Sequence, residues 1–271
     1  MTKFYSQYGQ DVLLNEIFKE KTNGIFVEVG CLDGRQFSNT LMFEEKGWKG
    51  LCIEANVKFI NHLKKNRPNS IICHCAAGDS DKNNVFFYAN KLGILSTLNS
   101  SLEDFFRITY RDLFFGFEKQ LVNKRRLDSL FKEYNITKID ILSIDVEGTE
   151  FDVLKGIDFN IFKPRVILIE SVKRDERKKI FKLLKFKGYK KSIFLKGDTF
   201  YVANKLDHKK IYNKRYKVIL HHTKNPFTNN NDKKIVTIID TTRFSSIKNR
   251  LLHILEFVKN IIKSKLGFIL N

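Results

Sequence analysis

Acidic side chains and glycines stand where several short apolar segments of the chain end. These residues are Glu28, Gly30, Asp33, Gly34, Glu54, Asp145, Glu147 and Glu170. In an open parallel sheet, ligands bind beyond the carboxyl ends of the strands, so residues at strand ends are the first candidates for chemistry. A carboxylate there can accept hydrogen bonds from hydroxyl groups, take a proton, attract a cation or bind a hard metal ion. The pattern therefore indicates a strongly acidic binding site.

The residues around the first glycines discriminate between classes of cofactor. A pyrophosphate would lie where Asp33 stands, and the segment EVGCLDG (28–34) lacks the third spaced glycine of a dinucleotide fingerprint, which disfavours NAD and FAD. A cationic ligand suits Asp33 better, and Glu54 has the spacing at which a carboxylate accepts both hydroxyls of a ribose. The small residues Ala76 and Ala77 would let a flat ring approach the backbone. S-adenosylmethionine (SAM) combines a sulfonium, a ribose and an adenine, so we predict a SAM site.

The hydropathy pattern predicts the elements that position these residues. Strands are expected at 25–30, 50–55, 70–75, 138–148 and 165–170, and helices at 6–20, 37–47, 56–66, 125–134, 149–157 and 175–188. Strands that alternate with helices indicate an α/β fold with a mostly parallel, doubly wound sheet. Two extended runs around Gly197 predict an antiparallel hairpin at its edge. Residues 80–122 are less regular, with an extra strand expected at 84–90 and a helix at 103–117.

Five segments of the chain resemble the FkbM family of SAM-dependent methyltransferases. They are YSQYGQD (5–11), FVEVGCLDGRQFSNT (26–40), FEEKGWKGLCIEA (43–55), RRLDSL (125–130) and IDILSIDVEGTEFDVLKGIDF (139–159). The resemblance covers roughly residues 4–204. It implies a class I (Rossmann-like) methyltransferase fold and O-methylation of a hydroxyl group, commonly on a sugar, polyketide or other natural product.

The resemblance also implies roles for individual residues. Cofactor-binding residues would be Gln7, Gly9 and Asp11 as an N-terminal lid, Glu28, Gly30, Asp33 and Gly34 around the methionine part, Glu54 at the ribose, and Ala76 and Ala77 beside the adenine. Asp145 and Glu147 would face the transferred methyl group as catalytic residues, aligning the acceptor or taking its proton. An alternative is a Mg²⁺ or Mn²⁺ ion held by Asp145 and Glu170.

The charge of the chain is concentrated in its second part. The net charge is +19, and residues 1–170 are neutral, so residues 171–271 carry the whole excess. We expect a methyltransferase domain at 1–204 and a basic C-terminal extension at 205–271, which ends in an amphipathic helix over 246–266. That extension could tether the protein to an anionic membrane surface or a partner, or pack on the domain or in a homo-oligomer.

The same excess makes RNA ribose methylation an alternative to a glycan or small-molecule acceptor. Against RNA, residues 1–170 are neutral and the chain has no aromatic–basic RNP motif, so nucleic acid is the weaker prediction. The four cysteines lie in or beside apolar runs without CxxC pairing, which is typical of a reducing compartment. The start of the chain has no apolar signal region. We therefore expect a cytoplasmic protein, with peripheral attachment to a membrane as the alternative.

Overall fold

A computed structural model describes residues 3–171, 173–212, 216–221 and 235–240. The chain divides into two compact units, residues 1–212 and 213–271. In the second unit, the strands β11 (Tyr216–His221) and β12 (Ile235–Asp240) form an antiparallel pair. The helix expected over 246–266 lies outside the described residues. The first unit continues past the expected boundary at residue 204, because helix α8 (Lys205–Tyr212) packs on β9 and on the first helix.

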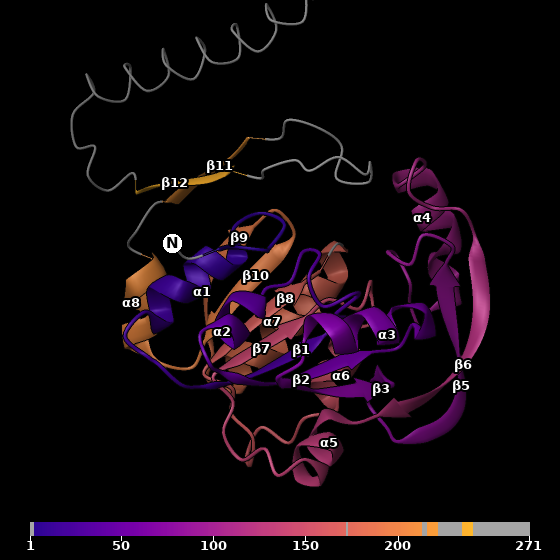
Figure 1. Cartoon of the computed structure of the whole chain (residues 1–271), viewed down its shortest axis with the longest axis horizontal. Helices are drawn as coiled ribbons and strands as arrows, with labels where there is room; N and C mark the ends of the chain where they lie inside the picture. Colours follow the sequence, from indigo (N-terminus) through magenta and orange to yellow (C-terminus); the bar gives the residue numbers. More distant parts are fainter. Residues whose placement is uncertain (1–2, 172, 213–215, 222–234, 241–271) are drawn as a thin grey trace, which may run out of the picture. The chain divides into compact units, whose positions relative to one another are not determined.

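A seven-stranded sheet in the order β3-β2-β1-β7-β8-β10-β9 forms the centre of the first unit (Figure 1). Its strands are β1 (Ile25–Val29), β2 (Lys49–Glu54), β3 (Ser70–His74), β7 (Ile141–Ile144), β8 (Val166–Glu170), β9 (Lys190–Leu195) and β10 (Asp198–Val202). The strands from β3 to β8 pair in parallel, whereas β10 runs antiparallel to both of its neighbours. The doubly wound sheet with an antiparallel edge hairpin is therefore confirmed.

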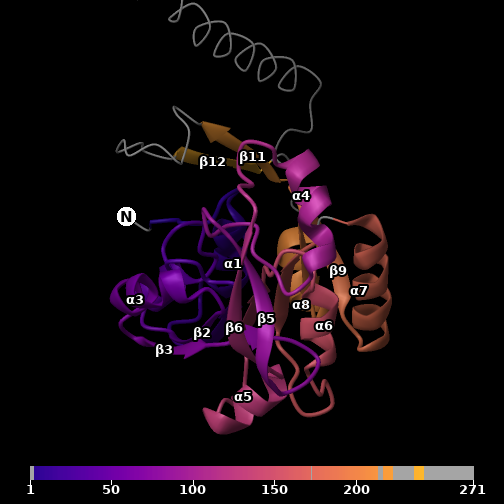
Figure 2. The ribbon, with the colours of Figure 1, turned by 90° about the vertical axis from the view of Figure 1, so that its right-hand side faces the viewer.

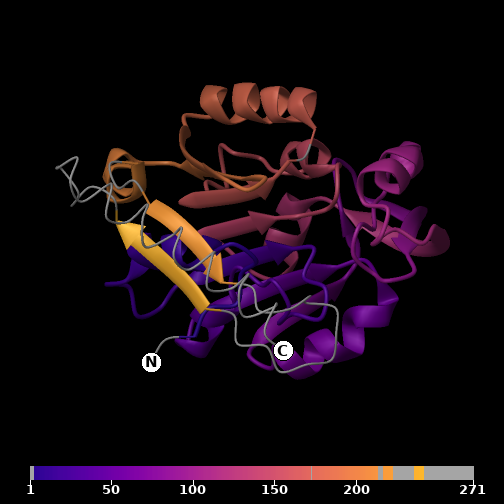
Figure 3. The ribbon, with the colours of Figure 1, turned by 90° about the horizontal axis from the view of Figure 1, so that it is seen from above.

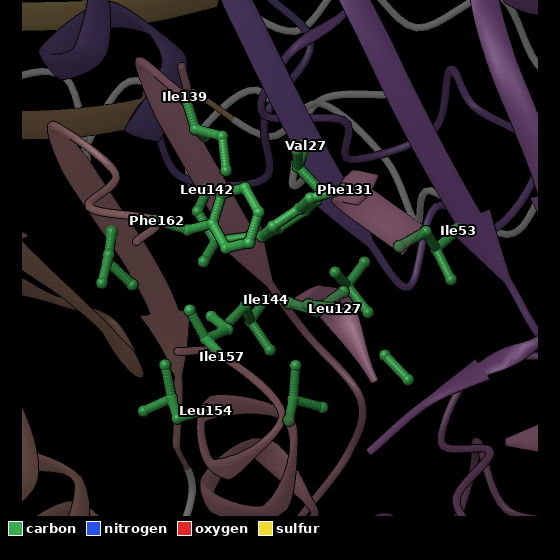
Figure 4. Packing of buried hydrophobic residues seen from close by; sticks show 14 of the residues in the cluster. Val27, Ile53, Leu127, Phe131, Ile139, Leu142, Ile144, Leu154, Ile157 and Phe162 are labelled. Carbon is green, nitrogen blue, oxygen red and sulfur yellow. The ribbon is translucent and has the colours of Figure 1, made fainter. Parts of the chain in front are cut away.

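Alternating side chains of the central strands cover the two faces of this sheet. Val27, Leu142 and Ile144 face a fully buried cluster with α5 (Leu127–Glu133), α6 (Glu150–Lys155) and α7 (Arg174–Phe186) (Figure 4). Apart from α4 (Glu103–Thr109), the other α-helices in the described part of the first unit are α1 (Gln10–Phe18), α2 (Leu41–Glu45), α3 (Val57–Asn66) and α8. Figures 2 and 3 show α7 at the opposite edge of the first unit from α3.

Much of the segment 80–122, which looked irregular in the sequence, belongs to a second sheet of three strands. Its strands are β4 (Ala76–Ala77), β6 (Phe117–Arg125) and β5 (Lys82–Asn90), in the order β4-β6-β5. A short 3-10 turn (Ser100–Leu102) leads into α4 (Glu103–Thr109), which lies at one end of the β5–β6 ribbon (Figure 2). The helix expected over 103–117 was thus too long, and β6 was not expected. Gly116 ends the intervening turn with φ +86°, a conformation that favours glycine.

Candidate active site

Backbone hydrogen bonds bring the ends of β1, β2 and β7 together at the carboxyl edge of the large sheet. The N–H of Gly30 donates to the carbonyl of Ile53 at 2.9 Å, and the N–H of Asp145 donates to the carbonyl of Val29 at 3.0 Å. A Cβ added to Gly30 would lie 1.8 Å from the Asp145 carbonyl oxygen. Glycine at position 30 therefore allows the close approach of the ends of β1 and β7, which sets the first candidate glycine beside the first candidate acid.

Three carboxylates gather at the ends of β7 and β8. One oxygen each of Asp145, Glu147 and Glu170 lies within 4.8 Å of the others. We call these residues the acidic trio. Repulsion by Asp145, followed by burial, raises the pKa of Glu170 to about 12. Glu170 is therefore the more readily protonated member of the pair, and its side chain hydrogen-bonds with Asp145. The side chain of Asp145 is exposed. Desolvation by the protein atoms around it nevertheless raises its pKa, and the charge of Glu28 adds to this shift.

The loop after β7 holds the acidic trio in a restrained conformation. Glu147 has φ +58°, which few residues other than glycine adopt, and Gly148 follows with φ +101°. The buried Glu150 carboxylate accepts the N–H groups of Val146 at 3.2 Å and Gly148 at 2.8 Å. Burial, with the charges of Asp145 and Glu150, raises the pKa of Glu147. A loop built in this way keeps acidic groups close together despite their repulsion.

Further polar side chains surround the acidic trio. Asp198 begins β10 opposite Glu170, and burial raises its pKa to about 7. The pKa of Tyr8 is raised by burial and by the charges of Glu170 and Asp198. The pKa of Tyr110 is raised to about 12 by burial and then by the acidic trio. Sequence reasoning missed Tyr8 and Asp198 as site residues, because neither lies in an acidic strand-end motif.

Glu54 occupies the end of β2, where the sequence placed a ribose acceptor. Its side chain is 5% exposed, and its two oxygens accept the N–H groups of Leu32 at 2.8 Å and Asn56 at 2.7 Å. Each oxygen keeps a second lone pair with which to accept a ligand hydroxyl. Burial raises the pKa of Glu54 to about 7, although its backbone hydrogen bonds oppose the shift. The predicted ribose role is compatible with this geometry and stays a prediction.

The candidate glycine loop after β1 is organised by Asp33 and Gly34. The Asp33 carboxylate accepts the N–H groups of Arg35 at 2.9 Å and Gln36 at 2.7 Å, so it closes a turn. Gly34 has φ +78°, and a Cβ there would meet Leu63 at 2.5 Å. Gly34 therefore serves a tight turn packed on α3. Contacts of Asp33 and Gly34 with a cofactor remain predictions.

The carboxylate of Glu28 is part of a buried ion network. Arg67 is fully buried and donates to Glu28 at 2.8 Å and to Glu44 at 2.6 Å. Glu28 also accepts the Thr40 hydroxyl at 2.7 Å and the Asn39 N–H at 2.8 Å. These groups occupy the carboxylate, so Glu28 anchors the loop after β1, and its expected place at the methionine part of a cofactor stays a prediction. The same contacts explain why α2 begins at Leu41, although the sequence predicted a start at residue 37.

A buried carboxylate, Asp11, organises the segment that was expected to form an N-terminal lid. Asp11 is fully buried and accepts the Ser6 hydroxyl and the N–H groups of Tyr5 and Ser6, with the N–H of Ser6 at 3.1 Å. Asp11 therefore fixes its own segment, and its expected role in a cofactor lid stays a prediction. Helix α1 begins at Gln10 instead of Ser6. Ser6 pairs with Phe37 in an isolated bridge, which places this segment beside the loop after β1. The roles expected for Gln7 and Gly9 stay predictions, and Gly9 precedes α1 with φ +88°.

Ala76 and Ala77 lie on opposite sides of strand β4. Ala77 belongs to the main buried cluster beneath the sheet, whereas Ala76 packs with Phe87 and Val122 of the second sheet. Ala77 is therefore a core residue, and its expected place beside an adenine stays a prediction. Ala76 is 5% exposed, and its contact with the cofactor stays a prediction.

A cleft of about 980 Å³ opens next to the acidic trio. We call it the α4 cleft. Gly148 and Thr149, directly after Glu147, form part of its wall. Its aromatic lining is Phe86, Tyr88, Phe105 and Phe151, and its charged lining includes Lys124, Asp152, Lys173, Arg174, Asp175, Glu176 and Lys179. The second sheet and α4 thus face the start of α7 across a space lined with rings and charges, beside the candidate catalytic acids.

The strand order, the antiparallel β10, the acid at the end of β2 and the acidic trio after β7 define a class I SAM-dependent methyltransferase. A family model described as the methyltransferase FkbM domain matches residues 28–191, which is more than half of the chain. The chain belongs to the FkbM methyltransferase family. A search of curated proteins gave no match.

Solved structures of other methyltransferases are similar to the chain at low scores. A precorrin-6y C5,15-methyltransferase from Geobacter metallireducens is 11% identical, with a TM-score of 0.38 and coverage of 71% of this chain and 84% of that one. An O-methyltransferase from Bacillus cereus in complex with SAH is 13% identical, with a TM-score of 0.39 and coverage of 74% and 81%. A TehB-like methyltransferase from Corynebacterium glutamicum is 10% identical, with a TM-score of 0.36 and coverage of 73% and 86%. At these scores the similarities carry no argument here.

The residues at the carboxyl edge fit SAM as the cofactor. Glu54 offers two lone pairs where a ribose diol would bind, and the acidic trio suits a positively charged sulfur. Three acids held so close together either retain protons or attract a cation. The chemistry of the donor set therefore agrees with the family.

Glu54→Ala should weaken SAM binding, because it removes charge-assisted hydrogen bonds of about 1.5 to 3 kcal/mol. The expected rise in the dissociation constant, measured by calorimetry, is about 10- to 150-fold. Since the pKa of Glu54 is about 7, protonation at lower pH competes with ribose binding. Wild-type affinity should thus fall from pH 8 to pH 6, whereas that of the variant should change less. An unchanged affinity in Glu54→Ala would remove this residue from the ribose site.

Proposed function

We propose that the protein transfers the methyl group of SAM to a hydroxyl group of a glycan or glycoconjugate. SAM supplies the methyl group on a sulfonium and leaves as a neutral thioether. The protein must therefore align the acceptor hydroxyl and take up its proton. Asp145 is suited to the second task, because it is exposed and the neighbouring Glu170 is the more readily protonated of the two. An oxygen acceptor needs a base of this kind.

The α4 cleft is the observation that supports a glycan acceptor. Aromatic rings contact the apolar faces of sugar rings, and charged side chains around them bind the hydroxyl edges. Phe86 is 54% exposed, and its ring borders the cleft. Lys173 lies 5.1 Å from the centre of the Phe105 ring on the opposite wall. Gly148, the residue after Glu147, lines the cleft. We infer from this adjacency that a sugar chain bound there would present a hydroxyl to Asp145.

Transfer of labelled methyl groups tests the acceptor class directly. The purified protein is incubated with methyl-labelled SAM and with separate glycan, lipid and RNA fractions of the source cells. We expect label in the glycan or glycolipid fraction, in a linkage that resists mild alkali as an ether does. Label confined to RNA would contradict the proposal and support the alternative of ribose methylation.

Phe86→Ala should raise the KM for the acceptor about fivefold, because it removes roughly 40 Å² of apolar contact, or about 1 kcal/mol. The dissociation constant for SAM should stay unchanged, since Phe86 lies on the second sheet and not at the strand ends. Phe115→Ala is the matched control, because Phe115 is 55% exposed and outside the cleft lining. If both variants changed the KM for the acceptor equally, the cleft would not be the acceptor-binding site.

The basic extension adds a proposal of its own, membrane or partner tethering by the helix expected over 246–266. Among the described residues, no helix is long and apolar enough to cross a bilayer. Removing residues 213–271 should leave SAM binding intact, because the first compact unit ends at Tyr212. A loss of SAM binding on truncation would show that the extension contributes to the methyltransferase unit.

A further inference from the structure

One side of the methyltransferase unit is strongly basic. Residues 173–196 contain nine lysines and two arginines, but only two acids, which gives a net charge of +9. We call the outer surface formed by α7 and β9 the α7–β9 face. Lys182, Lys185 and Lys191 are exposed there, and none forms an ion pair within the described part of the chain. Their charge is therefore open to an external anionic partner.

Three phenylalanines project from the same face. Phe186 is 83% exposed, Phe194 47% and Phe181 39%. The inner side of α7 is anchored by Ile180 and Leu184, which are fully buried. The three rings thus lie outside the hydrophobic core, and exposed rings gathered on one surface are typical of an interaction site.

Cations and rings alternate closely across the face. Arg177 lies 5.2 Å from the centre of the Phe194 ring, and Lys191 lies 5.8 Å from the same ring. Lys185 lies 5.9 Å from the centre of the Phe181 ring. Figures 2 and 3 show α7 along the outer edge of the first unit, and β9 is the last strand of the sheet. The surface is therefore the outside of a helix and a sheet edge.

We propose that the α7–β9 face docks on an anionic lipid surface. Lysine ammonium groups interact with negatively charged headgroups as point charges, and the phenylalanine rings enter the boundary between headgroups and acyl chains. Phenylalanine has no polar group that would require a hydrogen-bonding partner, which suits that boundary. Proteins usually bind single-stranded nucleic acid in a basic groove that follows its backbone. The side chains of the α7–β9 face instead lie on the outside of a helix. The inference is independent of the acceptor and of the C-terminal extension.

Vesicle co-sedimentation of the full chain tests the proposal. The probe is a vesicle of phosphatidylcholine with 30 mol% phosphatidylglycerol, compared with phosphatidylcholine alone. The Lys182→Glu/Lys185→Glu variant should reduce partitioning to the anionic vesicles at least 30-fold, because each lysine near such a surface contributes about fivefold. Phe186→Ser should reduce it about tenfold through lost apolar burial. Neither variant should change SAM affinity, which also shows that the fold is intact.

Matched controls separate this face from general charge and from the extension. Lys64→Glu/Lys65→Glu makes the same charge change on α3, and Ile161→Ser removes a side chain that is 59% exposed elsewhere. Both controls should bind vesicles within threefold of the wild type. The proposal is overturned if the wild type ignores anionic vesicles, if the controls lose as much binding as the face variants, or if the face variants bind like the wild type. If the face variants lost binding to an RNA oligonucleotide but kept their binding to vesicles, the proposal would likewise be overturned.

Discussion

Asp145→Asn should lower turnover about 10²- to 10⁴-fold, the range that acid–base catalysis commonly contributes. The amide cannot take the hydroxyl proton, yet it keeps the shape of the side chain, so the SAM dissociation constant should change much less. Turnover with an acceptor from the active fraction and calorimetry with SAM measure the two effects. Asp112→Asn is the matched control, because it removes an exposed acid of α4's following turn. Comparable turnover of Asp145→Asn and the control would show that Asp145 is not the base.

Chelation distinguishes the base from the alternative of a metal ion at the same residues. The acidic trio is close enough to share a divalent cation, which would extend the predicted pair of Asp145 and Glu170 by Glu147. If Asp145 acts as a base alone, wild-type turnover should be the same with EDTA and with added Mg²⁺ or Mn²⁺. Loss of activity in EDTA and its recovery with Mg²⁺ would assign the trio to metal binding instead.

Arg67→Met should destabilise the protein by about 3 to 5 kcal/mol, which is the second large effect that we expect. Arg67 is fully buried, and its removal leaves Glu28 and Glu44 as buried carboxylates without their cation. Denaturant unfolding followed by circular dichroism would measure the lower midpoint. Because these acids hold the loop after β1, SAM affinity should fall as well.

The control for this prediction is an ion pair at the surface. Arg107 pairs with Glu103 at 2.7 Å along α4, and its side chain is 63% exposed. Arg107→Met should therefore change the free energy of unfolding by only about 0.5 kcal/mol. If Arg67→Met cost no more than this control, the buried network would not stabilise the fold in the way that we infer.

The carboxyl edge of the sheet could be predicted from the sequence because a local signal marks it. Runs such as IFVEVG and GLCIEA are β-branched, short and followed by acids, so both the strands and their ends are visible. Arg67 has no such signal. It stands in the segment KKNRPNS, which is typical of a solvated helix end, and only the tertiary structure brings it to Glu28 and Glu44.

Strand β6 and the two alanines of β4 show a second limit. In FEKQLVNKR, charged residues alternate with few apolar ones, and Leu121 is 61% exposed, so the pattern does not distinguish a strand from a loop. The pairing of β6 with β4 and β5 supplies the missing stability. The sides on which Ala76 and Ala77 lie follow from that pairing register, which a two-residue strand does not reveal in its sequence.

The second sheet and α4 have small hydrophobic clusters of their own, separate from the main core. One contains Phe87 and Val122, and the other contains Leu102 and Phe106. Substitutions that reshape the wall of the α4 cleft can therefore accumulate without disturbing the strands that hold the strand-end acids. In evolutionary terms, such a separation lets a lineage exchange one acceptor for another while inheriting the same catalytic base. We expect related chains to diverge most between β3 and α5.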